Sequence, residues 1–211
     1  MDENLLRQEM VAYCKSLFER GYSCGTSGNI SVRCEDALLV TPTNSSFGSL
    51  DPDRISKISL DGKGTLLSGD KPSKEWVLHY GFYERRPECG AVVHLHSSFA
   101  VAVSCLQDIN PANTIPPITP YFVMRVGDLP LAPYFPPGDI RLAEAVTELA
   151  ANHSSVLMAN HGPVVSAKNL KAAVGASEEL EETAKTYLLI KDSKFVTLTS
   201  AQISELKKKY G

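Results

Sequence analysis

The chain has 211 residues, of which 43% are hydrophobic and 21% charged, and its formal net charge is -3. This composition is typical of a globular protein with a sizeable core, and we expect a single domain over residues 1–211. The small negative charge gives no general attraction to nucleic acid or to anionic membranes. The longest apolar runs fall far short of a bilayer span, so no membrane segment is predicted.

The start of the chain and its cysteines favour a cytoplasmic location. The first four residues are acidic and polar, unlike the basic start and apolar stretch of a signal peptide. The five cysteines are odd in number and include no Cys-x-x-Cys pair. This pattern indicates scattered thiols in a reducing compartment, and it argues against a disulfide framework or a thiolate metal site.

Apolar periodicity predicts short strands interspersed with helices along the chain. In chain order we expect a helix at 4–20, strands at 30–33, 37–41 and 55–60, a helix at 74–85, a strand at 90–95, a helix at 98–106, a strand at 122–126, a helix at 139–152, strands at 156–159 and 164–166, and a helix at 168–191. This mixture predicts an α/β fold, a single domain with a central, largely antiparallel sheet flanked by helices.

The motif His94-Leu95-His96 at the end of an apolar run is the clearest chemical feature of the chain. In a strand, residues i and i+2 face the same side, so the two imidazoles are expected to lie side by side. Neutral imidazole is a common metal ligand, and two of them supply half of a tetrahedral site.

Two further residues are candidates to complete this site. His161 follows an apolar strand and precedes Gly162, which permits a tight turn at the rim of the sheet. Glu75 lies at the start of a predicted helix, where the helix dipole alone also favours an acidic residue. Beside a metal, Glu75 would be the fourth ligand or a proton-transfer base. Because a lone histidine is more often structural, His79 and His153 are interpreted as structural or surface residues.

Small-residue loops offer groups that bind anions. Residues 25–29 and 43–46 expose backbone N–H groups and hydroxyls, and Ser73 adds a hydroxyl at a predicted helix start. Neither loop matches a P-loop or the G-x-G-x-x-G pattern, so no dinucleotide site is predicted. Each loop taken alone is more often an ordinary turn than an anion site.

Taken together, the motifs resemble the class II aldolase/epimerase family typified by fuculose-phosphate aldolase, over about residues 5–190. The five motifs that carry the resemblance, in chain order, are Gly25-Thr26-Ser27-Gly28-Asn29, Thr41-Pro42-Thr43, Pro72-Ser73-Lys74-Glu75-Trp76, His94-Leu95-His96-Ser97 and Ala159-Asn160-His161-Gly162. The resemblance implies a divalent metal held by His94, His96 and His161, with Glu75 as metal-proximal acid/base. It also implies a homotetramer with active sites between subunits.

The resemblance further implies a site for the substrate phosphate. The residues expected to hold it are Gly28, Asn29, Thr43, Asn44, Ser73 and Lys74. The chain departs from the aldolase pattern at two of these positions, with Asn44 where the aldolases usually have Gly and Lys74 where they usually have a second Ser. The added cation beside Glu75 suggests a more anionic substrate.

Residues 68–75, 119–127 and 178–185 look like the subgroup of 3-oxo-tetronate 4-phosphate decarboxylases. We therefore expect a carbon–carbon lyase that decarboxylates a 3-oxo-tetronate 4-phosphate to dihydroxyacetone phosphate through a metal-stabilised enediolate. Protonated Glu75 would deliver a proton to the enediolate carbon, and Tyr121 would reach a neighbouring subunit's site. Zn²⁺ is the expected metal, with Mn²⁺ or Co²⁺ as alternatives.

Three other functions within the same family stay open. A sugar-phosphate aldolase, such as fuculose-1-phosphate aldolase, shares nearly every site residue. A ribulose-phosphate epimerase fits less well, because such enzymes have an aspartate at the position of Glu75. A non-catalytic module like the adducin head domain is disfavoured by the presence of all three histidines and Glu75.

Overall fold

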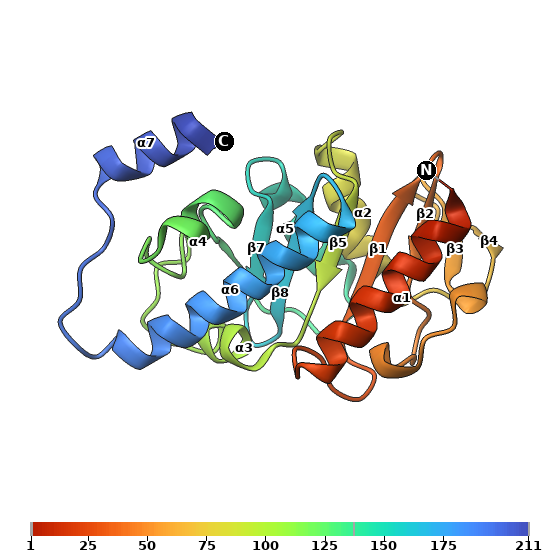
Figure 1. Cartoon of the computed structure of the whole chain (residues 1–211), viewed down its shortest axis with the longest axis horizontal. Helices are drawn as coiled ribbons and strands as arrows, with labels where there is room; N and C mark the ends of the chain where they lie inside the picture. The colour runs from red at the N-terminus through yellow and green to blue at the C-terminus, as the bar shows by residue number, and fades with distance from the viewer. Residues whose placement is uncertain (1, 137, 211) are drawn as a thin grey trace.

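All the strands in the described chain form one eight-stranded sheet. The computed structural model describes residues 2–136 and 138–210, and Figure 1 shows their arrangement. The strands are β1 (Asn29–Cys34), β2 (Ala37–Val40), β3 (Ser56–Ser59), β4 (Leu66–Ser68), β5 (Ala91–His94), β6 (Leu131–Ala132), β7 (Ser155–Met158) and β8 (Gly162–Ala167). Their order is β4-β3-β2-β1-β5-β8-β7-β6, and every pair is antiparallel except β6–β7. The predicted α/β fold with a largely antiparallel sheet is confirmed.

Helices cover both faces of this sheet. They are α1 (Glu3–Glu19), α2 (Trp76–Arg85), α3 (Ser98–Ser104), α4 (Pro120–Arg125), α5 (Ile140–Ala150), α6 (Leu170–Ile190) and α7 (Ser200–Tyr210), with 3-10 turns at Phe47–Ser49 and Pro52–Arg54. In Figure 1, α1 and α6 lie across the face nearer the viewer, with α2 and α5 on the other face. None of the described helices is long and apolar enough to span a membrane.

Strand β5 shows why the sheet is apolar on both sides. Val93 packs with the core under α1 and α6, whereas Val92 packs with the core under α2 and α5. Successive side chains of a strand point to opposite faces, so a doubly covered strand must be apolar throughout. The same alternation places His94 on the α2 side of the sheet.

The strand predicted at 122–126 is wrong, because this segment forms α4. The Thr119 hydroxyl oxygen accepts a hydrogen bond from the Phe122 N–H (3.2 Å), and Pro120 occupies the first turn. A Thr cap followed by Pro is a helix start, and here it outweighs the strand preference of the apolar residues that follow. Helix α2 begins at Trp76, two residues later than predicted, and β4, β6 and α7 were not predicted.

The topology brings distant segments to one edge of the sheet. Asn29 opens β1 and pairs with His94, which closes β5. Beyond β5, the antiparallel pair β7–β8 turns between Met158 and Gly162, at the same edge. Residues at these strand ends are therefore neighbours in space although they lie far apart in the sequence.

Candidate metal centre

His94 is held at the end of β5 with one ring nitrogen directed into the site. Its side chain is fully buried, and its Nδ1 donates a hydrogen bond to the Pro163 carbonyl oxygen at 2.8 Å. A carbonyl can only accept, so the proton of neutral His94 is on Nδ1. The Nε2 lone pair is then free to bind a cation, in the arrangement usual for a metal-binding histidine.

Four candidate ligand atoms converge at this point. The His96 Nε2 atom lies 3.0 Å from His94 Nε2 and 3.2 Å from His161 Nε2. The Glu75 carboxylate closes the group, with its oxygens 3.5 Å from His94 Nε2 and 3.4 Å from His161 Nε2. Two ligands that are each about 2.0–2.1 Å from a tetrahedral metal stand about 3.3 Å apart. These four spacings of 3.0–3.5 Å are close to that value, and one ligand atom of each residue lies within 4.8 Å of the others, so the four residues fit a divalent metal.

Glycines permit the close approach of the two loops that frame the site. At Gly162, φ is +154°, and a side chain there would collide with the Leu95 carbonyl oxygen. At Gly28, φ is +81°, and a Cβ atom would lie only 2.9 Å from the His94 carbonyl oxygen. A larger residue at either position would push a loop away from the segment that carries His94 and His96.

The electrostatics of the cluster suit a metal site. Burial lowers the pKa of His94 to about 3 and also lowers the pKa of His96. Burial raises the pKa of Glu75, but the hydrogen bond to His161, the charge of His94 and the Asn29 hydrogen bond outweigh it and lower the pKa. Near neutral pH the cluster therefore pairs neutral His94 and His96 with an ionised Glu75, the protonation states that metal binding requires.

The residues predicted to hold phosphate divide into two groups. Asn29 borders the metal cluster, because its amide donates a hydrogen bond to Glu75 Oε2 at 2.7 Å. The loop containing Thr43 and Asn44 lies beside the segment that precedes α2, because the Thr43 N–H bonds the Lys71 carbonyl oxygen at 2.9 Å. In the same segment, the Ser73 hydroxyl oxygen accepts a hydrogen bond from the Glu75 N–H at 3.3 Å. Asn29 and Ser73 thus contact Glu75 directly, whereas Thr43 and Asn44 line a separate cleft of about 320 Å³.

Lys74 and Tyr121 are less closely placed. Lys74 is exposed in the turn before α2. Tyr121 was predicted in a loop, but it lies on α4 with 56% of its surface exposed, against the Arg125 guanidinium. Within one copy of the described chain, Tyr121 belongs neither to the metal cluster nor to the cleft beside it.

A cleft of about 640 Å³ opens beside the metal cluster. Glu75, His96 and His161 are among the residues that line it. The other lining residues were not predicted for this cleft from the sequence; they are Ser98, Val101, Tyr134, Phe135 and Asn160. The aromatic pair follows β6 after Pro133, and β6 runs parallel to β7 and so ends at the same edge. Because β6 has only two residues, periodicity gave no sign of it.

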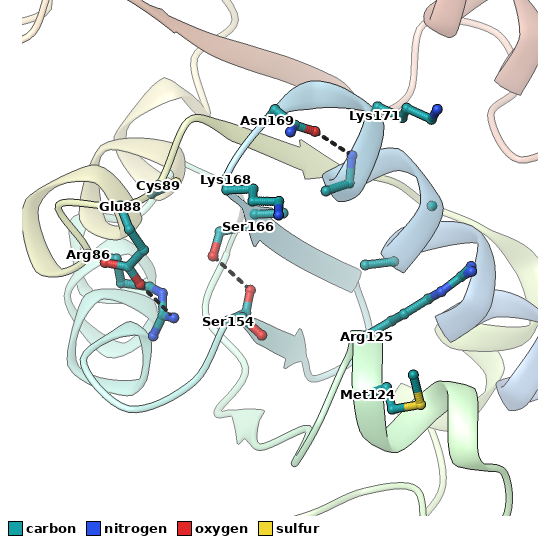
Figure 2. Close-up of a pocket in the computed structure, with 14 residues that line it drawn as sticks. Arg86, Glu88, Cys89, Met124, Arg125, Ser154, Ser166, Lys168, Asn169 and Lys171 are labelled. Carbon is teal, nitrogen blue, oxygen red and sulfur yellow. Dashed lines mark hydrogen bonds and ion pairs between the residues drawn. The ribbon is translucent and has the colours of Figure 1, made fainter. Parts of the chain in front are cut away.

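A second cleft, of about 790 Å³, lies at the opposite end of β5 (Figure 2). Its cations do not converge on one point: Arg86 pairs with Glu88 at 2.8 Å, and Arg125 lies 4.0 Å from Glu179. Figure 2 shows Arg86 and Arg125 on opposite sides of the cleft, while Lys171 points away. This cleft is larger than that beside Glu75, but it lacks a comparable set of converging groups.

The chain belongs to the family of the class II aldolase and adducin N-terminal domain, whose model matches residues 8–188. It is 50% identical to the 3-oxo-tetronate 4-phosphate decarboxylase of Escherichia coli (strain K12), over 97% of this chain and 96% of that one. It is 34% identical to the L-fuculose phosphate aldolase of the same strain, over 89% and 85% of the two chains.

A solved structure shares both the fold and much of the sequence. YgbL from Escherichia coli, described as a putative aldolase/epimerase/decarboxylase, superposes with a TM-score of 0.94 at 48% identity. The match covers 97% of this chain and 99% of that one. The family resemblance predicted from the motifs is therefore confirmed.

Proposed function

We propose that this protein is a metal-dependent carbon–carbon lyase that converts a 3-oxo-tetronate 4-phosphate to dihydroxyacetone phosphate and CO₂. The observation that carries the proposal is the convergence of Glu75, His94, His96 and His161, whose ligand atoms lie within 4.8 Å of one another, beside an open cleft. The 50% identical relative bears the decarboxylase name, whereas the relative that bears the aldolase name is 34% identical. This difference favours decarboxylation over aldol cleavage.

His94, His96 and His161 would hold the metal, with Glu75 as fourth ligand or as a group next to it. Three neutral imidazoles and a carboxylate suit Zn²⁺, and Mn²⁺ or Co²⁺ would also be accepted. When bound, such a cation is a Lewis acid that stabilises negative charge developing on a substrate oxygen.

Glu75 would move the proton that the reaction needs. Since its pKa is lowered, the resting carboxylate first accepts the proton of the substrate C2 hydroxyl. The bond between C1 and C2 then breaks and CO₂ leaves. The electron pair of that bond moves towards the C3 ketone to give an enediolate. Glu75 returns the proton to C2, and solvent supplies the one proton consumed overall.

The neighbouring loops would position the substrate. Thr43, Asn44 and Ser73, with the Gly28 loop and Lys74, would bind the C4 phosphate and use that binding to orient the C1–C2 bond. We further propose a homotetramer in the cytoplasm, in which Tyr121 reaches the site of a neighbouring subunit. Each of the five cysteines is a free thiol, which accords with a reducing compartment.

The test is a comparison of Glu75→Gln with Glu84→Gln, which alters an exposed residue of α2, the helix that Glu75 precedes. With a phosphorylated 3-oxo-tetronate, the wild-type protein and Glu84→Gln should release CO₂ and dihydroxyacetone phosphate. Glu75→Gln should retain metal by elemental analysis but lose about 10²- to 10⁴-fold in turnover. Unchanged turnover would refute the role of Glu75. Formation of an aldehyde with dihydroxyacetone phosphate from a sugar phosphate, without decarboxylation, would assign the aldolase function.

A further inference from the structure

A chain of buried polar groups runs from Glu75 into the core. Beyond the Glu75–Asn29 bond, the Asn29 Oδ1 atom lies 2.5 Å from His79 Nε2. The His79 Nδ1 atom lies 2.7 Å from the Ser31 hydroxyl, which lies 2.9 Å from the Tyr83 hydroxyl. His79 and Ser31 are fully buried. Apart from Glu75, none of these residues belongs to the metal cluster or lines its cleft.

One assignment of donors and acceptors satisfies all the hydrogen bonds between these buried polar groups. An ionised carboxylate only accepts, so the Asn29 amide nitrogen donates to Glu75 and its Oδ1 faces His79. Oδ1 also only accepts, so His79 carries its proton on Nε2 and its Nδ1 accepts from the Ser31 hydroxyl. The Ser31 oxygen then accepts from the Tyr83 hydroxyl, and every group has a partner.

The secondary structure explains how these groups meet. Glu75 immediately precedes α2, and His79 lies within it, one turn later. The two side chains are therefore on the same face of the helix. Asn29 and Ser31 are residues i and i+2 of β1, so both side chains point to the same face of the sheet. His79 therefore contacts two successive side chains of that face and ties the orientation of Asn29 to the position of the helix.

We infer that His79 is a positioning residue for the proton-transfer step: it holds the Asn29 amide in the orientation that donates to Glu75. This inference rests on the proposed function. Without the Nε2–H donor, the Asn29 amide is free to rotate and to present its oxygen to the carboxylate. Because hydrogen bonds to charged groups are the strong ones, losing this orientation should lower kcat by about 10- to 100-fold.

Three variants separate positioning from general destabilisation. His79→Phe removes the donor, whereas His79→Gln keeps an N–H group at a similar distance from the backbone. Phe82→Leu alters a fully buried residue of the same helix that takes no part in the polar chain, so it is the matched control. We expect His79→Phe to lose the stated kcat while KM and metal content stay within about twofold, His79→Gln to regain most of the loss, and Phe82→Leu to keep kcat.

A measurement without substrate tests the same inference independently. In ¹⁵N-histidine-labelled protein stripped of metal, the NMR signal that disappears in His79→Gln should report a proton on Nε2. A proton on Nδ1, an unchanged kcat in His79→Phe, or an equal loss in Phe82→Leu would overturn the inference. If the wild-type protein converts no tetronate phosphate, the proposed function fails, and the NMR result still decides how His79 is bonded.

Discussion

The buried His79 should make the stability of the protein depend on pH, in a window that the structure defines. Burial lowers the pKa of His79 to about 4 from an ordinary value of 6.5. As pH falls below 6.5, His79 binds a proton in the unfolded chain but not in the folded chain. The free energy of unfolding that is present above pH 6.5 is therefore progressively lost as pH falls towards 4. At pH 5 the loss is about 2 kcal/mol, because each pH unit in this window is worth about 1.4 kcal/mol.

The assay is urea unfolding of metal-stripped wild-type protein and His79→Gln at pH 7.5 and pH 5.0. A chelator is present and the protein concentration is constant, because metal binding and subunit association would each shift the apparent stability. His94 and His96 contribute to both proteins, so the difference between the two pH dependences isolates His79. The wild-type protein should lose about 2 kcal/mol more than the variant between the two pH values. Parallel losses would refute the assignment of His79 as a neutral, buried group.

Three further outcomes follow from the geometry of the site. Gly162→Ala should lower the unfolding free energy by about 2 kcal/mol or more in urea titrations, because the new Cβ meets the Leu95 carbonyl at a strained φ. Glu181→Ala removes a carboxylate that accepts two backbone N–H groups at the start of α3, both at 2.8 Å, and should lower the thermal midpoint by roughly 8 °C in calorimetry. His96→Ala should release metal and activity together, measured by elemental analysis and CO₂ release, and full activity in chelator-treated protein would contradict the proposed metal dependence.

The metal cluster was accessible to prediction because its residues carry local patterns. His94 and His96 follow an apolar run at the spacing of a strand, and His161 stands between an apolar strand and a glycine. The structure brings all three together, although β5 already ends at His94 and His96 lies beyond it. The i, i+2 spacing was therefore informative even where regular strand geometry stops.

The surroundings of the cluster depend on contacts that no local pattern records. A single histidine inside an apolar helix is usually structural, and nothing in the sequence near His79 shows that Asn29 and Ser31 lie against it. That contact requires α2 to pack against β1, which is separated from it in sequence by three strands and several turns. Likewise, Tyr134 and Phe135 reach the cleft only through the two-residue strand β6.

The same topology explains why the fold itself brings the four ligand atoms together. Each histidine is attached to a strand end or a tight turn whose neighbours are buried on both faces of the sheet, and Glu75 follows a segment whose Lys71 carbonyl oxygen accepts a hydrogen bond from the Thr43 N–H of the adjacent loop. Close-packed interiors resist displacement, so the ligands cannot relax apart without disturbing both cores. We therefore infer that the metal would bind to a preorganised site, and that loosening a frame residue such as Gly162 would weaken metal affinity without removing a ligand.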